Sequence, residues 1–115
     1  MTTLAITPWT APNLPTARHA THQYALRLHG APGGRIRIRA SGLASGWLAT
    51  FCTQRVCSLR QVSVELSRTG SALVEFALVH DGASRTTDMY VRITTDDGAS
   101  LTLLVSSKPR SRAYV

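Results

Sequence analysis

The sequence has 115 residues, of which 43% are hydrophobic and 17% are charged. This length fits one compact domain with a buried core, and the apolar content excludes an intrinsically disordered protein. No apolar run approaches the roughly 18 residues that a membrane-spanning helix needs, and 2 cysteines are too few for a disulfide-rich miniprotein. The 13 basic residues outnumber the 6 acidic ones, which gives a net charge of +7.

The basic excess has two interpretations that the sequence leaves open. Positive charge favours contact with nucleic acid, anionic lipid or acidic glycans. However, Lys108 is the only lysine among the 13 basic residues, and alanine is abundant. This arginine bias is also typical of a GC-rich genome, so the charge is either selected for anion binding or is a matter of composition.

The two ends of the chain differ from the middle. Residues 1–21 are rich in proline and threonine and are expected to be extended and irregular, because proline fixes φ and lacks an N–H group. Within them, Thr3–Thr7 is expected to form a short edge strand. The segment lacks the charged region and apolar stretch of a signal peptide. Residues 107–115 are expected to form a basic, flexible tail.

Residues 22–106 alternate apolar and polar side chains with a period of two, which is typical of half-buried β-strands. The expected strands are His22–His29, Arg35–Ala40, Trp47–Thr53, Arg60–Leu66, Ala72–Val79, Thr87–Thr95 and Ser100–Ser106. Turns rich in glycine, proline and aspartate separate them, and no segment combines helical periodicity with helix caps. We therefore predict an all-β fold, an antiparallel β-sandwich of seven or eight strands that occupies residues 22–106.

One face of each expected strand supplies the core. The residues expected to face inward are Tyr24, Leu26, Leu28, Ile36, Ile38, Trp47, Phe51, Val62, Val64, Leu66, Val74, Phe76, Leu78, Met89, Val91, Ile93, Leu101, Leu103 and Val105.

The middle of the chain carries a pattern that resembles a known family. Its parts are Gly46-Trp47-Leu48-Ala49-Thr50-Phe51-Cys52, then Cys57, then Val62-Ser63-Val64-Glu65-Leu66, a turn with Gly70, and Val74-Glu75-Phe76. The pattern resembles bacterial immunoglobulin-like accessory domains of the NEW3 kind, in strand order over roughly Tyr24 to Val105. The resemblance implies an immunoglobulin-like sandwich that acts as a spacer or interaction module. It also implies an extracytoplasmic location, periplasmic or secreted, beside hydrolases and thioredoxin-like lipoproteins.

Cys52 and Cys57 are the only cysteines. Their spacing does not match the Cys-x-x-Cys motif of thioredoxin-like redox proteins. A disulfide between them would close a six-residue loop and contribute about 2 kcal/mol at most, and it would imply an oxidising compartment. Free core thiols, and a metal or redox role, are the alternatives.

Residues with catalytic or metal-binding chemistry are few. His19 and His22 could supply zinc ligands together with the two cysteines, but metal sites usually pair their ligands within short elements, so solvated histidines are favoured. Ser45 does not fit the Gly-x-Ser-x-Gly motif of hydrolases. Most acidic residues fall in turns or at outward strand positions. The sequence therefore predicts no catalytic residue, no metal site and no cofactor.

The most distinctive polar pattern is a row of arginines. Arg35, Arg37 and Arg39 alternate with isoleucines, so one sheet face would carry all three at intervals of about 6.5–7 Å, close to the spacing of phosphates along a nucleic-acid strand. If this strand pairs with His22–His29, Arg27 joins the row. The alternative is a solvated face that discourages edge-to-edge aggregation. Nucleic-acid binders usually add exposed aromatics, and Tyr90 is the only one expected on an outward strand position.

These observations support three hypotheses in order. The first is a non-catalytic immunoglobulin-like module that mediates protein interaction or spacing, with another protein as its partner. The alternative is binding of a polyanion, a nucleic acid or an acidic glycan, through Arg27, Arg35, Arg37 and Arg39. The least favoured is a small enzyme or metal carrier.

Overall fold

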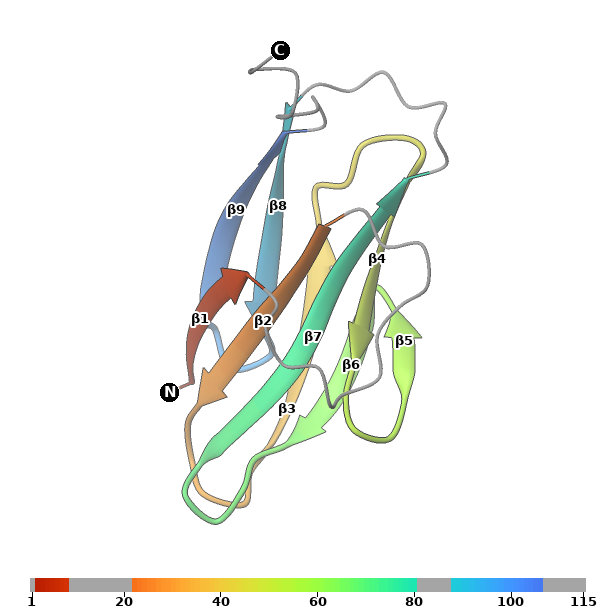
Figure 1. Ribbon diagram of the computed structural model, residues 1–115. Coiled ribbons are helices and arrows are strands. Elements are labelled where there is room, and N and C mark those ends of the chain that lie inside the picture. Colours follow the sequence, from red (N-terminus) through yellow and green to blue (C-terminus); the bar gives the residue numbers. More distant parts are fainter. Residues whose placement is uncertain (1, 9–21, 81–87, 107–115) are drawn as a thin grey trace.

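The computed structural model describes residues 2–8, 22–80 and 88–106, which form a sandwich of two antiparallel sheets (Figure 1). In this part of the chain there are nine strands: β1 (Thr3–Pro8), β2 (His22–His29), β3 (Arg35–Ser41), β4 (Trp47–Cys52), β5 (Cys57–Leu59), β6 (Gln61–Glu65), β7 (Ser71–His80), β8 (Asp88–Thr95) and β9 (Ser100–Ser106). One sheet has the order β1-β2-β7-β4-β5 and the other β6-β3-β8-β9. The predicted all-β, antiparallel sandwich is confirmed.

The strand count differs from the predicted seven or eight because of β5. This strand has three residues, too few to show the alternation on which the prediction rests, and it forms by pairing with the end of β4. The expected edge strand at Thr3–Thr7 is present as β1, which pairs with β2 along its whole length. The sandwich therefore includes a strand from the segment that the sequence set apart as irregular. The expected tail at residues 107–115 lies outside the described residues.

The core lies between the two sheets. Every residue predicted to face inward belongs to the buried cluster or packs against it. Phe51 of β4 and Phe76 of β7 lie opposite each other with ring centroids 5.0 Å apart and have no exposed surface. Ile38 and Ile93 are fully buried on the other sheet. Burial of each such side chain contributes about 1.5–3 kcal/mol, so the alternation of apolar residues accounts for the association of the sheets.

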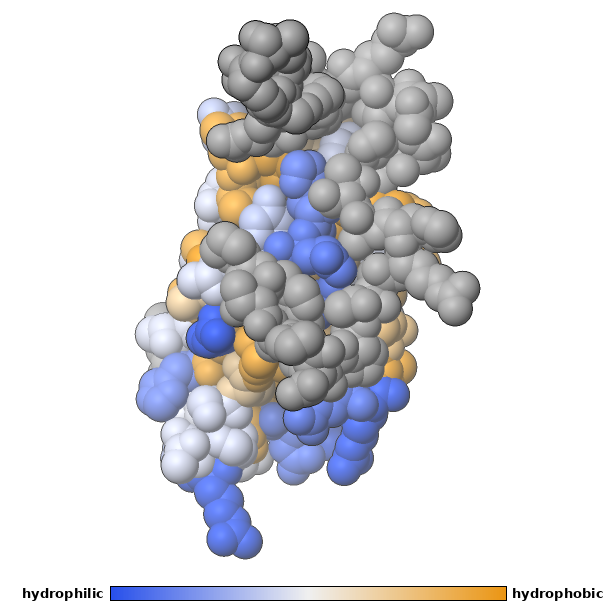
Figure 2. Space-filling view, in the orientation of Figure 1, coloured by the Kyte–Doolittle hydropathy of each residue, from blue (hydrophilic) through white to orange (hydrophobic). Residues whose placement is uncertain are grey.

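The outer surface is mixed in character. Figure 2 shows apolar and polar patches interspersed over the described part of the face that carries the five-stranded sheet. Across residues 2–8, 22–80 and 88–106, no helix is long and apolar enough to cross a membrane.

The chain passes from the five-stranded to the four-stranded sheet at Arg60, between β5 and β6. The Arg60 N–H donates to the Ala49 carbonyl of β4 at 2.9 Å, and the Arg60 carbonyl accepts from the Ala40 N–H of β3 at 2.9 Å. Arg60 has a φ of 68°, in the left-handed region. Among the described residues, it is the only one other than glycine with a positive φ. One residue therefore joins the two sheets through its backbone.

At one end of the sandwich, the β2–β3 and β6–β7 turns meet backbone to backbone (Figure 1). The Gly30 N–H donates to the Gly70 carbonyl at 2.7 Å. Gly70 has a φ of 80°, and a Cβ atom there would lie 2.2 Å from the Gly30 carbonyl oxygen. Only glycine fits this position, because any side chain would separate the two turns.

Candidate functional site

The three arginines of β3 lie on one exposed face, as the sequence predicted. Arg35, Arg37 and Arg39 are exposed, whereas Ile36 and Ile38 between them are buried. The strand alternates because its isoleucines pack into the core, so its arginines must project from the outer side of the four-stranded sheet.

Arg27 does not join this row, because the pairing of His22–His29 with the arginine strand, on which that expectation depended, does not occur. It lies on β2, which belongs to the five-stranded sheet, whereas β3 pairs with β6 and β8. The Arg27 guanidinium donates to the Thr7 hydroxyl of β1 at 3.0 Å. Although β2 and β3 are consecutive, the chain changes sheets between them, and this separates the two sets of arginines.

The structure instead brings β8 beside β3, and β8 and its neighbour β9 add three residues to the face. Arg92 lies opposite Ser41, and Arg39 lies opposite Thr94, so Arg39 and Arg92 are diagonal neighbours about 7–8 Å apart. Tyr90, two residues from Arg92 on β8, is 66% exposed, and Leu104 opposite it on β9 is 53% exposed. We call this surface the arginine–tyrosine face; its residues are Arg35, Arg37, Arg39, Tyr90, Arg92 and Leu104.

Carboxylates flank one end of the arginine–tyrosine face. Glu65 of β6 lies opposite Arg35. Asp96 contacts the backbone of Arg37, whose N–H donates to the carboxylate at 3.3 Å and whose carbonyl accepts from the Asp96 N–H at 3.1 Å. Arg39 lies opposite Gln61 and Thr94 instead. The positive charge of the face is therefore least compensated around Arg39 and Arg92.

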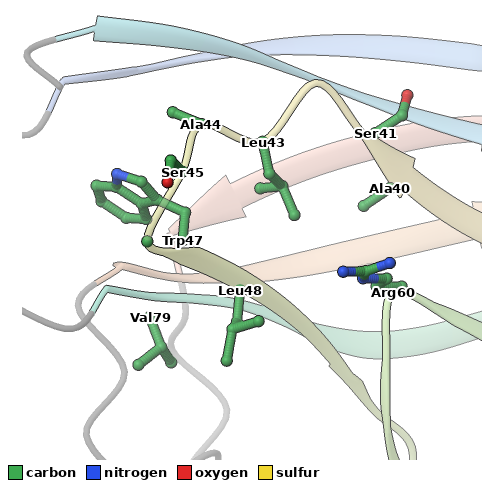
Figure 3. A pocket seen from close by; sticks show the side chains of 10 residues that line it. Ala40, Ser41, Leu43, Ala44, Ser45, Trp47, Leu48, Arg60 and Val79 are labelled. Atoms are coloured by element: carbon green, nitrogen blue, oxygen red, sulfur yellow. The ribbon is translucent and has the colours of Figure 1, made fainter. Parts of the chain in front are cut away.

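A hollow of about 800 Å³ lies between β3 and β4, at the side of the sandwich (Figure 3). It exists because β6 pairs with β3 only up to Arg39, and β5 pairs with β4 only from Thr50. The loop that joins β3 to β4 forms its wall, with positive φ at Gly42 and Gly46. The described residues that line the hollow are Ala40, Ser41, Leu43, Ala44, Ser45, Gly46, Trp47, Leu48, Arg60 and Val79.

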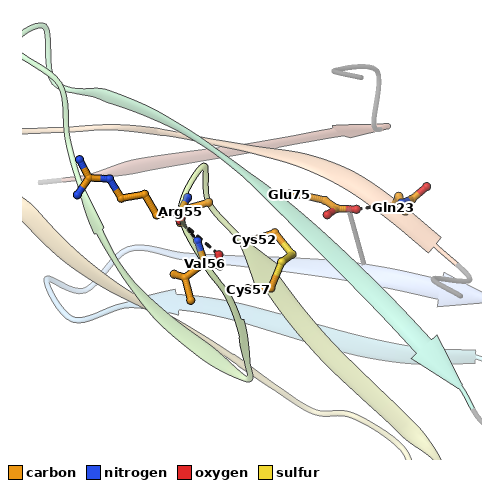
Figure 4. The surroundings of a disulfide bond; sticks show 7 residues. Gln23, Cys52, Arg55, Val56, Cys57 and Glu75 are labelled. Carbon is orange, nitrogen blue, oxygen red and sulfur yellow. Dashed lines mark hydrogen bonds between the residues drawn. A yellow bond between two sulfur atoms is a disulfide. The ribbon is translucent and has the colours of Figure 1, made fainter. Parts of the chain in front are cut away.

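Cys52 and Cys57 form a disulfide between β4 and β5 (Figure 4). The two residues lie directly opposite each other in the strand register. Within the hairpin, the Thr53 N–H donates to the Val56 carbonyl at 2.8 Å. The disulfide that the sequence favoured is confirmed, so neither sulfur is a free thiol or a thiolate ligand for zinc.

Glu75 occupies an outward strand position, but its side chain is buried. It lies opposite Cys52 on the outer side of the five-stranded sheet, yet it has no exposed surface. The Gln23 amide donates to its carboxylate at 2.9 Å (Figure 4). Ala25 and Ala77 beside it are also buried, so this part of the outer side is closed to solvent.

His22 is likewise not the solvated histidine that the sequence favoured. Its side chain is half-buried at the end of the core. The imidazole stacks on Trp47 with ring centroids 5.8 Å apart and on Tyr24 at 6.5 Å. This position follows from β2, which places His22 and Tyr24 on the same, inward face. His19, the other half of the His-x-x-His pair, lies outside the described residues.

No family model matches the sequence, and no curated protein matches it. Two solved structures are similar in shape. A DUF4466 family protein from Parabacteroides merdae has 11% identity and a TM-score of 0.46, and the match covers 93% of this chain and 44% of that one. A lipoprotein from Bacteroides thetaiotaomicron has 10% identity and a TM-score of 0.39, and the match covers 96% of this chain and 83% of that one. This chain thus spans less than half the length of the DUF4466 protein.

Proposed function

We propose that this chain is a non-catalytic, immunoglobulin-like module that binds a partner protein through the arginine–tyrosine face. The observation that carries the proposal is the grouping of Arg39, Arg92 and exposed Tyr90 on two adjacent strands. Tyrosine and arginine are enriched in protein interfaces and among the residues that contribute most to binding. Leu104 adds apolar area next to Tyr90, as the centre of an interface requires.

Strand order supports the immunoglobulin-like part of the proposal. In that class, strands A, B, E and D form one sheet, and strands C, F and G form the other. Here β1, β2, β7 and β4 are adjacent in one sheet, and β3, β8 and β9 in the other, which is the same arrangement in the same chain order. β5 and β6 form an insertion between the fourth and fifth positions. The disulfide joins β4 to β5 rather than bridging the sheets, so the chain would be a variant of the class.

The chemistry of the face supports binding rather than catalysis. The face consists of arginine, tyrosine and leucine side chains, whereas general acid–base catalysis most often uses histidine or a carboxylate. The disulfide supports an extracytoplasmic location, because disulfides persist in oxidising compartments.

Photo-crosslinking tests the proposal. The photo-reactive residue benzoylphenylalanine in place of Tyr90 is expected to capture one acidic protein in the cells that make this chain. Changing Arg39 and Arg92 to Ser should lower the yield of that adduct. The matched control carries the same probe at Leu59, which is 60% exposed on the other sheet. Equal capture at both positions, or a yield unaffected by the loss of the arginines, would contradict the proposal.

Polyanion binding is the second candidate, supported by the regular row of Arg35, Arg37 and Arg39 on β3. It is less favoured because Glu65 and Asp96 lie beside two of these arginines. If it holds, the chain should bind heparin or oligothymidylate with an affinity that falls with salt. Replacing the three arginines with Ser should then remove about three ion contacts from the salt dependence. Retention on a heparin column equal to that of a control protein of the same net charge would reject this candidate.

A further inference from the structure

We propose that the hollow between β3 and β4 binds an aliphatic monocarboxylate, with the carboxylate at Arg60 and the hydrocarbon chain around the open edge of β4, against Leu43 on its inner side and Leu48 on its outer side. This site is separate from the arginine–tyrosine face, and it does not depend on the function proposed above. It would give the module a small-molecule ligand of its own.

The size and composition of the hollow fit such a ligand. Its volume of about 800 Å³ lies within the range of roughly 300–1,000 Å³ typical of small-molecule sites, which are mostly apolar with a few polar groups. Apolar side chains from three segments line it, on both sides of β4: Leu43 of the loop and Trp47 lie on the inner side, and Leu48 and Val79 lie on the outer side (Figure 3). Leu48 is 46% exposed although it is apolar, so a hydrocarbon chain packed on it would remove this surface from water.

Arg60 supplies the charge. It is the only charged residue among the described residues that line the hollow. Figure 3 shows its side chain in the gap between the ribbons of β3 and β4, near Ala40. The planar fork of a guanidinium matches a carboxylate, to which it can donate two parallel hydrogen bonds.

The backbone of Arg60 provides a separate reason to assign it a role. Its φ of 68° is a conformation that glycine or asparagine adopts at lower cost, and such conformations in other residues cluster at functional sites. The hydrogen bonds from Arg60 to Ala49 and from Ala40 to Arg60 fix this backbone to both sheets. The side chain therefore starts from a rigid base at the end of the hollow, which reduces the entropy that it loses on binding.

The same lining selects the class of ligand. One guanidinium balances one negative charge, and most of the other lining side chains are alanine, leucine and valine, which have no hydrogen-bonding groups. A sugar or a polyphosphate would have to bury hydroxyl or phosphate oxygens against these side chains without hydrogen bonds, at a large cost. A single carboxylate on an aliphatic chain leaves no polar group unsatisfied.

Fluorescence titration tests the site with a dansyl-labelled undecanoic acid as the probe. Dodecanoate, below its micelle concentration, should displace the probe. Dodecanol has the same chain without the charge, and it should bind at least about ten-fold more weakly. Lack of probe binding, or equal displacement by the acid and the alcohol, would overturn the proposal.

Variants separate the role of Arg60 from its place in the fold. Arg60→Gly should weaken dodecanoate binding at least about ten-fold without lowering the melting temperature, because glycine suits the positive φ. Arg60→Lys should retain part of the affinity, and Leu48→Ser should weaken binding of the acid and the alcohol alike. The matched control is Arg68→Gln, which removes an exposed arginine from the β6–β7 turn and should leave binding unchanged. Unchanged binding by Arg60→Gly would overturn the assignment.

A last comparison separates this site from the arginine–tyrosine face. A variant with Arg35, Arg37 and Arg39 all changed to Ser should bind dodecanoate as the wild type does, although its net charge is lower. A loss as large as that of Arg60→Gly would show that the carboxylate responds to the overall charge, and this would contradict the proposed site.

Discussion

The carboxylate of Asp97 accepts two hydrogen bonds from Thr2, one from the backbone N–H at 2.9 Å and one from the hydroxyl at 2.7 Å. Thr95 also donates its hydroxyl to this carboxylate. Asp97 lies in the β8–β9 turn and Thr2 directly precedes β1, so these bonds tie an edge strand of one sheet to a turn of the other. The hydroxyl of Thr95, with the hydroxyl and N–H of Thr2, holds the pKa of Asp97 well below its usual range, because all three stabilise the charged form.

The first prediction concerns acid. Because the pKa of Asp97 is depressed in the folded state, its contribution to stability is present above the unfolded value of about 3.9. The contribution is lost as pH falls below that value toward the folded pKa. Asp97→Ala should therefore lower the free energy of unfolding at neutral pH. The difference in this free energy between the variant and the wild type should become smaller below about pH 4. Urea denaturation at several pH values provides the measurement. A difference in the free energy of unfolding that stays constant down to acidic pH would contradict the prediction.

The second prediction compares two glycines with positive φ. A Cβ atom added at Gly33, where φ is 71°, would meet no other atom within 4 Å, whereas one added at Gly70 would meet the Gly30 carbonyl. Gly33→Ala should cost about 1 kcal/mol, for the backbone conformation alone. Gly70→Ala should cost about 3 kcal/mol or more, because it also forces the two turns apart. If denaturant unfolding shows that both variants lose the same free energy of unfolding, the two turns can move apart without cost.

The third prediction concerns the disulfide. The intact mass without reductant should be about 2 Da lower than the mass after reduction. Changing Cys52 and Cys57 together to Ala should lower the free energy of unfolding by up to about 2 kcal/mol, since the bond closes a short loop. Two thiols that react with iodoacetamide in the native, unreduced protein would contradict the bond.

The fourth prediction concerns the stability of the crossing between the sheets. Arg60→Gly should raise the free energy of unfolding by up to about 1 kcal/mol, because glycine adopts the left-handed conformation without a steric penalty. Arg60→Val should lower it, since a β-branched side chain tolerates positive φ least. Thermal unfolding of both variants provides the measurement. A loss of stability in Arg60→Gly would show that packing of the arginine side chain outweighs the backbone cost.

Local sequence patterns predicted every described strand except β5, and they predicted the inward face of the other strands between residues 22 and 106. In a strand, successive side chains point to opposite sides, so an apolar residue at every second position specifies the buried side whichever strand lies next to it. For this reason the burial of Ile36 and Ile38, and the exposure of the arginines between them, could be predicted locally. The disulfide could also be predicted, because Cys52 and Cys57 are close in the chain and flanked by strand-forming residues.

Which strands lie side by side depends on contacts between residues far apart in the chain, so it follows from the three-dimensional fold and not from local patterns. β2 and β3 are consecutive but belong to different sheets, which places Arg27 away from the other arginines. β8 lies next to β3, which places Arg92 beside Arg39. The hollow between β3 and β4 exists because β6 ends its pairing at Arg39. Alternation fixes the direction in which a side chain points, whereas the pairing of distant strands fixes its neighbours, and the neighbours make the candidate sites.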